Sequence, residues 1–158
     1  MTRYEKRLKK TIPYQHWDEG EGSGWLRAVN KEPLPGNDPK AVLIQCAQGD
    51  GQVSTWSAHI QARAYGAVQL QYPLRDIYGV VSTRRMWVPD GSSAVVEYGF
   101  PDVSVDPLLN VPPVTDSHGR ISGLEHAQQQ VQEFLTTGVI WNHCEGPPTG
   151  HTCYESND

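Results

Sequence analysis

The chain of 158 residues has the length of one domain and a net charge of −5, with 37 % apolar and 20 % charged residues. Its 15 Gly and 12 Pro are too few for a low-complexity chain, so we expect it to fold. No apolar run approaches the roughly 18–20 residues of a membrane span. Because no apolar stretch follows the basic start, we expect a cytoplasmic protein without a secretory signal.

The charge is unevenly distributed along the chain. Residues 1–85 hold twelve of the thirteen basic residues against eight acids, whereas residues 86–158 hold ten acids and only Arg120. The second part therefore has a net charge of −9 and repels nucleic acid, since phosphate binding needs Lys and Arg. It would attract a basic protein surface and speed its capture. Solubility alone is the other interpretation of this acidity.

Residues 1–40 read as an irregular N-terminal arm and packing loop. The first ten residues carry five basic side chains, which is typical of a frayed helix or a disordered arm. Glycines and prolines then punctuate residues 11–40 and exclude a long regular element. Trp17 and Trp25 indicate that this stretch still packs onto something.

From residue 41 the pattern changes to short apolar or alternating runs separated by turn residues. The turns include Gly49-Asp50-Gly51, which predicts a hairpin, and a Pro-Asp-Gly-Ser sequence that begins at Pro89. Residues 53–63 alternate loosely and are predicted as a strand with His59 on one face and Trp56 on the other. The predicted strands are residues 41–47, 53–63, 67–72, 78–88 and 93–99.

One amphipathic helix is predicted over residues 121–138. Ser122 and Glu125 form a candidate capping box, apolar residues recur at spacings of three and four, and Gly138 is placed to end the helix. Residues 139–143 then predict a last short strand. These elements indicate an α+β fold, with an antiparallel sheet of about five to six strands and one long C-terminal helix packed on it. We expect this domain to span residues 41–144, followed by a polar tail over residues 145–158.

The densest group of chemically active side chains lies at the C-terminus and comprises His143, Cys144, His151 and Cys153. Zinc binding would need these residues to converge, but His143 and Cys144 are neighbours and the spacing matches no common zinc motif. A Cys144–Cys153 disulfide is the second possibility. Three Cys without an export signal favour a third, a plain tail with reduced thiols.

Other candidate catalytic groups are weak. The chain has no Gly-x-Ser-x-Gly sequence, Asp116-Ser117-His118 are three successive loop residues, and His59 lies within a strand pattern. We therefore predict no catalytic residue, no metal site and no cofactor, and we expect a binding protein instead of an enzyme.

The order of segments from residue 66 to residue 144 resembles the actinobacterial branch of immunity protein family one, found beside polymorphic secreted toxins. The resemblance rests on a Gly-Ala-Val strand at residues 66–72, Trp87, a Val-Glu-Tyr strand at residues 94–99 and a proline loop at residues 111–114. Its most specific part is residues 131–141, where Glu-Phe-Leu-Thr-Thr-Gly precedes a strand bearing Trp. The resemblance implies a non-enzymatic inhibitor that binds and occludes the active site of a cognate toxin, often a nuclease or nucleic-acid deaminase.

Under this hypothesis, acidic loops would cover the basic cleft of the toxin. The expected contact residues are four loop acids and an aromatic anchor: Asp90, Asp102, Asp106, Asp116 and Phe100. Phe100 has core packing as its other interpretation. We expect a monomer until the toxin binds, with no direct contact to nucleic acid or membrane. The alternatives are a small metal-dependent enzyme or metal-binding protein that uses the C-terminal His and Cys residues, and a structural or assembly protein that self-associates.

Overall fold

The computed structural model describes residues 22–103, 117–144 and 153, which belong to two compact units divided between Pro39 and Lys40. In the first unit, the 3-10 helix η1 (Gly22–Trp25) leads into the short helix α2 (Leu26–Asn30), and Arg27 forms an ion pair with Glu32. All other elements belong to the second unit. The three-part division expected from the sequence, with a tail from residue 145, stays a prediction.

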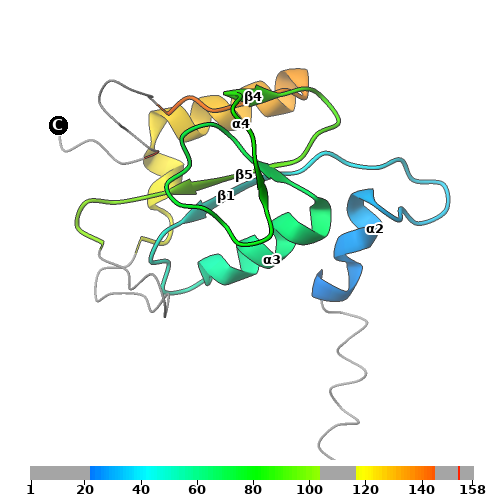
Figure 1. The fold of residues 1–158 in the computed structure, drawn as a ribbon, viewed down its shortest axis with the longest axis horizontal. Helices are drawn as coiled ribbons and strands as arrows, with labels where there is room; N and C mark the ends of the chain where they lie inside the picture. Colours follow the sequence, from blue (N-terminus) through cyan, green and yellow to red (C-terminus); the bar gives the residue numbers. More distant parts are fainter. Residues whose placement is uncertain (1–21, 104–116, 145–152, 154–158) are drawn as a thin grey trace, which may run out of the picture. The chain divides into compact units, whose positions relative to one another are not determined.

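The second unit is built on a four-stranded parallel sheet (Figure 1). Its strands lie in the order β1 (Leu43–Ala47), β5 (Ala94–Tyr98), β2 (Val68–Gln69) and β3 (Val81–Ser82), and every neighbouring pair is parallel. The two remaining strands, β4 (Trp87–Val88) and β6 (Ile140–Trp141), form a separate antiparallel ribbon. The predicted antiparallel sheet of five to six strands is therefore wrong.

The segment predicted as a strand over residues 53–63 is the helix α3 (Thr55–Tyr65). The Ser54 hydroxyl accepts a hydrogen bond from the backbone N–H of Trp56 at the start of the helix, and Gly66 ends it at φ 67°. Parallel strands cannot be joined by a hairpin, so the chain from β1 to β2 needs a crossover, and α3 provides it. The hairpin predicted at residues 49–51 is wrong for the same reason.

The predicted C-terminal helix lies within residues 121–138, but its start and its partners differ from the prediction. The 3-10 helix η2 (Arg120–Gly123) comes first, and α4 spans Glu125–Thr137 with Leu124 as its N-cap. The capping box does not form, because Ser122 lies within η2 and the N-cap position of α4 is taken by Leu124, which offers no side-chain acceptor. The Ser122 hydroxyl donates to the Gly119 carbonyl at 2.6 Å instead. With α2 and α3, the described residues contain three α-helices, so the predicted architecture of one helix on an antiparallel sheet is wrong.

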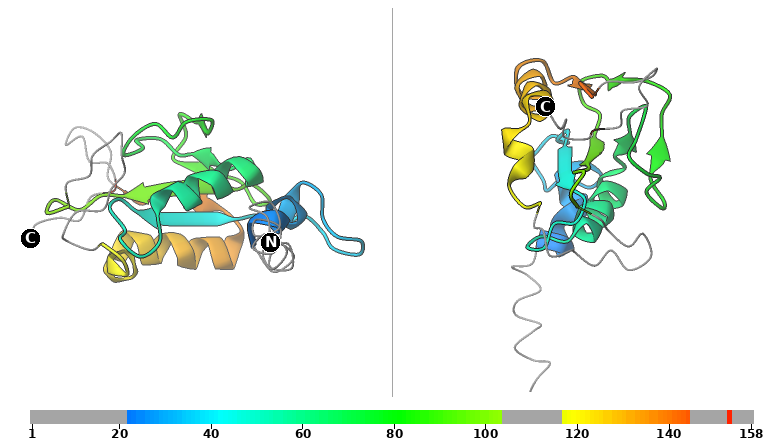
Figure 2. Two further views of the ribbon diagram at one scale, coloured as in Figure 1. Left: turned by 90° about the horizontal axis from the view of Figure 1, so that it is seen from below. Right: turned by 90° about the vertical axis from the view of Figure 1, so that its left-hand side faces the viewer.

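The helices α3 and α4 cover opposite faces of the parallel sheet (Figure 2). Because side chains alternate along a strand, Cys46 and Val95 pack on the α3 side, whereas Val96 and Tyr98 belong to the cluster that packs with α4. The unit is a three-layer arrangement of mixed α/β type. None of the helices in the described ranges is long and apolar enough to cross a membrane.

Candidate functional site

The antiparallel ribbon of β4 and β6 presents two stacked tryptophans to the solvent. The register pairs Trp87 with Trp141 and Val88 with Ile140. Val88 and Ile140 are 8 % and 0 % exposed, so they form the inner face, and the alternation of a strand turns both tryptophans outward. The indoles are 38 % and 36 % exposed, with ring centroids 6.3 Å apart and planes 2° from parallel.

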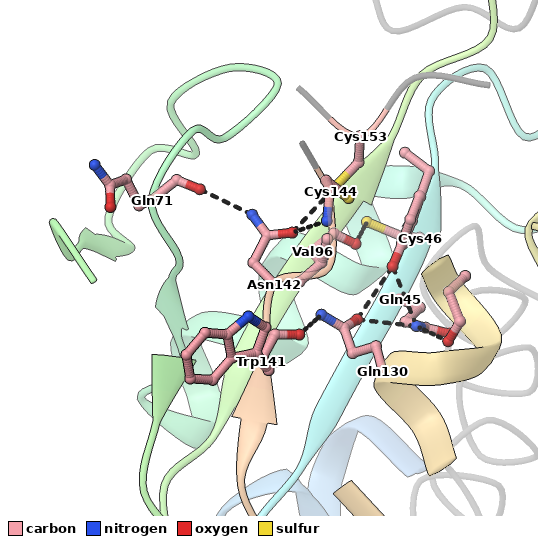
Figure 3. The surroundings of a disulfide bond; sticks show 11 residues. Gln45, Cys46, Gln71, Val96, Gln130, Trp141, Asn142, Cys144 and Cys153 are labelled. Atoms are coloured by element: carbon pink, nitrogen blue, oxygen red, sulfur yellow. Dashed lines mark hydrogen bonds between the residues drawn. A yellow bond between two sulfur atoms is a disulfide. The ribbon is translucent and has the colours of Figure 1, made fainter. Parts of the chain in front are cut away.

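Two hydrogen bonds tie the ribbon to the rest of the unit (Figure 3), and a third extends the pairing between its own two strands. The side-chain amide of Gln130 on α4 donates to the Trp141 carbonyl at 2.7 Å. Asn142 donates through its side chain to the Gln71 carbonyl at 2.8 Å and through its backbone to the Met86 carbonyl at 2.6 Å. These bonds hold Trp141 in one position, so little conformational freedom of its backbone would be lost on binding a partner.

Behind the ribbon, a buried polar network connects α4 to two strands of the sheet. The side-chain amide of Gln45 donates to the Gln130 side chain at 2.9 Å and to the Ala127 carbonyl at 3.0 Å, and the Tyr98 hydroxyl donates to Gln130 at 3.1 Å. Burial raises the pKa of Tyr98, so its hydroxyl stays protonated and can donate. Gln130 thus links the sheet to the ribbon.

Cys144 and Cys153 form a disulfide, which was one of the possibilities left open by the sequence. The favoured interpretation of reduced thiols at Cys144 and Cys153 is therefore wrong. Asn142 accepts a hydrogen bond from the Cys144 backbone N–H at 3.0 Å (Figure 3). The Cys153 carbonyl accepts one from the Gly99 backbone N–H at 2.8 Å. The bridge therefore fastens the end of β6 to the end of β5.

The disulfide also removes the C-terminal residues as a candidate zinc site. Both sulfur atoms are bonded to each other, and Nε2 of His143 lies 2.8 Å from the Glu133 carboxylate on α4. His151 lies outside the described residues. The alternative of a metal-dependent enzyme built on these four residues therefore loses three of its ligands.

The expected partner-binding residues lie in different places. Asp90 is exposed in the turn after β4. Its carboxylate lies against Gly138 at the C-terminal end of α4, so closely that a Cβ atom on Gly138 would overlap it. Asp102 is paired with Arg120 of η2, which precedes α4, so the two acids contact residues that flank opposite ends of that helix. Asp106 and Asp116 lie outside the described residues.

Phe100 lies in the core and not on the surface where an anchor would act. It is 1 % exposed, and the Arg120 guanidinium lies over its ring at 4.3 Å from the centroid. The same guanidinium donates to both carboxylate oxygens of Asp102, at 2.8 and 3.0 Å, and lowers the pKa of Asp102. Asp102 is therefore already paired with a cation.

Trp87 and Trp141 are the exposed aromatic pair that sequence reasoning missed. Each tryptophan alternates with an inward apolar residue, which is a readable signal for a half-exposed strand. The strands are only two residues long and 53 positions apart, however, so the sequence does not show that they pair. Their stacking becomes visible only in the structure.

A cavity of about 320 Å³ lies beside β1, between α3 and η2. Its lining includes the side chains of Cys46, Ser57, Gln61 and a pair formed by Asp50 and His118. The Asp50 carboxylate lies 3.0 Å from Nδ1 of His118 and accepts the backbone N–H groups of Gln52 and Val53. Burial alone would raise the pKa of Asp50, but these hydrogen bonds outweigh it and lower the pKa.

A second group of titratable side chains is buried between α3 and the sheet. Arg75 donates to both oxygens of Glu97 at 2.7 and 2.8 Å, and Nε2 of His59 lies 3.5 Å from the same carboxylate. Burial alone would raise the pKa of Glu97, but the adjacent His59 and Arg75 outweigh it and lower the pKa. Burial raises the pKa of the neighbouring Cys46 thiol, which disfavours the thiolate that nucleophilic attack requires.

Comparison with known proteins found no matching family model, no matching curated protein and no matching solved structure. The resemblance to immunity protein family one therefore stays a prediction.

Proposed function

We propose that the chain is a non-enzymatic immunity protein that binds a cognate toxin and occludes its active site. The observation that carries the proposal is the stacked pair of Trp87 and Trp141 on a ribbon held by hydrogen bonds. Tryptophan is enriched among the residues that dominate binding energy. The stacked pair also stabilises the ribbon as a cross-strand aromatic pair, while more than a third of each indole stays exposed for a partner.

The charge around the ribbon indicates what kind of protein would bind. Both strands, α4 and the loops between them belong to residues 86–158, whose net charge is −9. Asp90 lies at the same end of the ribbon as Gly138. A carboxylate beside the C-terminal end of a helix meets the negative end of the helix dipole, so its position is unfavourable until a cation arrives. A basic partner would supply that cation.

We define the Trp surface as Trp87, Trp141 and Asp90. A toxin that acts on nucleic acid needs a basic cleft, so a nuclease or a nucleic-acid deaminase fits this surface. Asp102 is a weaker candidate than the sequence indicated, because Arg120 already neutralises it. We therefore expect Asp90→Lys to lower the affinity for the toxin more than Asp102→Lys does. Asp90→Lys should also make that affinity less dependent on the salt concentration.

The proposal places the chain in the cytoplasm of the producing cell, where disulfides are rare. The Cys144–Cys153 bridge weighs against this location unless the ribbon keeps its place without it. The hydrogen bonds that the side-chain amides of Gln130 and Asn142 donate go to backbone carbonyls and not to sulfur, so they can hold Trp141 in the reduced protein. We expect a Cys144→Ser/Cys153→Ser variant to bind the toxin as the wild type does. If binding requires the bridge, cytoplasmic action is wrong.

The function is tested by protection of cells. The proposal requires a toxin domain encoded in a neighbouring reading frame. That domain would be expressed with the wild-type chain, with Trp87→Ala/Trp141→Ala, or with Trp56→Ala. Trp56 is a matched control, because it is an exposed tryptophan on α3, which covers the opposite face of the sheet from α4. We expect growth with the wild type and with Trp56→Ala only. Absence of protection by the wild type contradicts the function, and equal protection by all three contradicts the surface.

A further inference from the structure

Three side chains with metal-binding atoms meet between α3 and the sheet. Cys46 on β1 and Glu97 on β5 are register partners on the same face, and His59 reaches them from α3. The thiol sulfur, one imidazole nitrogen and one carboxylate oxygen all lie within 4.8 Å of one another. The residues are 13 and 38 positions apart in the chain, so their meeting depends on the parallel pairing of β1 with β5.

The distances fit a tetrahedral ion closely. Zinc bonds of about 2.0 Å to nitrogen and oxygen and about 2.3 Å to sulfur place the ligand atoms roughly 3.3–3.6 Å apart. Nε2 of His59 and Oε1 of Glu97 are already 3.5 Å apart. Only Cys46 would have to approach, by about 1 Å, which a rotation about its χ1 angle can supply.

The hydrogen bonding of the group also fits a metal site. Nε2 of His59 is buried and makes no well-formed hydrogen bond among the described residues, and its printed polar neighbour is the Glu97 carboxylate at the long distance of 3.5 Å, which is unusual for a buried polar atom. Arg75 donates to both oxygens of Glu97 and fixes the carboxylate, as residues behind a metal ligand commonly do. Each carboxylate oxygen has a second lone pair, so this ion pair leaves Glu97 able to coordinate.

We propose that Cys46, His59 and Glu97 bind one Zn²⁺ ion. The thiolate and the carboxylate supply the two negative charges, and the thiol proton of Cys46 is released to the solvent when the ion binds. Three protein ligands leave a fourth position for water. Cys46 also lines the 320 Å³ cavity beside β1, from which water can reach this side of the sheet. The site is separate from the Trp surface and independent of the proposed toxin binding.

The full chain with its disulfide intact is suited to the test, because Cys46 is then the one free thiol. Metal-free protein would be titrated with Zn²⁺ by calorimetry and, separately, with Co²⁺ in a spectrophotometer. We expect one ion per chain, a near-ultraviolet thiolate-to-cobalt charge-transfer band and the visible bands of tetrahedral Co²⁺. Absence of the charge-transfer band in the wild type overturns the proposal without any variant.

The variants are Cys46→Ser and His59→Gln, with His126→Gln as the matched control. His126 is also a half-buried histidine whose Nε2 has no partner in the described residues, but it stacks on Tyr98 in the α4 cluster. We expect Cys46→Ser and His59→Gln to lower the affinity for Zn²⁺ more than about tenfold, because tenfold is already the smallest loss usual for residues that only support a metal ligand. His126→Gln should leave the affinity unchanged. Equal binding by all three variants overturns the site.

Discussion

At the scale of single residues, the buried pair of Glu97 and Arg75 has the largest consequences for stability. Glu97 is the most deeply buried charge in the described ion pairs, with a side chain that is 1 % exposed. Both carboxylate oxygens accept from the guanidinium, so the charge is compensated in place. Removal of one partner from such a pair leaves a buried charge without compensation.

We expect Arg75→Ala to lower the free energy of unfolding by about 3 kcal/mol, measured by urea denaturation with a chelator present. Arg84→Ala removes a similar side chain from an exposed position and should change stability by less than about 0.5 kcal/mol. Equal losses of unfolding free energy in the two variants would show that the ion pair with Glu97 adds no stability beyond that of an exposed arginine.

Two carboxyl groups with little solvent exposure, in addition to the exposed Asp102, shape the acid limb of the stability curve. The pKa of Glu97 and the pKa of Asp50 both lie below their ordinary values of 4.5 and 3.8, so the unfolded chain takes up protons at a higher pH than the folded chain. Their contribution is full above the ordinary pKa and is lost as the pH falls through the folded pKa.

The free energy of unfolding should therefore fall more steeply below about pH 4.5 than it does near pH 6, where only the lowered pKa of His126 acts among the described residues, measured by urea denaturation at each pH. Asp50→Asn keeps an oxygen for the N–H groups of Gln52 and Val53 but removes the charge, so the fall should be shallower. A wild-type curve that stays level down to pH 3.5 would contradict the lowered pKa values.

At the scale of elements, the end of α4 is where helix, ribbon and acidic turn meet. Gly138 has φ 74°, a conformation that side-chain-bearing residues rarely adopt, and its N–H donates to the Phe134 carbonyl. A side chain at this position would also collide with Asp90. Helix termination and the position of the Trp surface therefore depend on one glycine.

Gly138→Ala should lower the free energy of unfolding by about 1–3 kcal/mol, because the strained backbone and the displaced Asp90 both cost free energy. Gly123→Ala is the control, since Gly123 has no positive φ and a Cβ there meets nothing within 4 Å. Thermal or urea unfolding measures the free energy of unfolding of both variants. A Gly138→Ala variant no less stable than Gly123→Ala would contradict the role of the helix end.

The disulfide joins two elements across a separation of nine residues. Closing a loop of this size is worth about 2–3 kcal/mol in the chain-entropy account, so Cys144→Ser/Cys153→Ser should be less stable than the oxidised wild type by that amount. Thiol titration of the unfolded protein should find one free thiol before reduction and three after it, because the chain has three Cys. Three thiols without reductant would show that the bridge does not form.

At the scale of the whole molecule, local patterns predicted some elements and long-range pairing decided the fold. The end of α4 at Gly138 and the strand at residues 94–98 follow from local spacing and turn chemistry. The sequence does not reveal the helix α3, because the large apolar Trp56 and Ile60 are exposed and alternate with Ser57 and His59 as in a half-buried strand. The order of the parallel strands is not readable from the sequence, because β5 lies between β1 and β2 in the sheet. Its paired residues are about 50 positions from those of β1 and 26 positions from those of β2.

The candidate site shows the same limit. Acidity in residues 86–158 is readable from composition, but whether an acid is paired is not, as Asp102 with Arg120 demonstrates. Phe100 was a reasonable surface candidate until the structure placed it in the core. The tryptophan pair, the disulfide and the Cys46 group each require residues distant in the chain to meet, which one sequence without its fold does not reveal.

The central claim is that Trp87 and Trp141 carry the binding of a basic protein, and a calorimetric titration tests it most directly. The purified toxin domain from the neighbouring reading frame would be titrated into the wild type, Trp87→Ala/Trp141→Ala and Trp56→Ala, each first shown to be folded. We predict one-to-one binding whose affinity decreases with salt and is unaffected by Trp56→Ala. The double change should lower the affinity more than about 30-fold, which corresponds to the loss of one residue that contributes about 2 kcal/mol to binding. Equal affinity of the double variant and the Trp56→Ala control would contradict the claim.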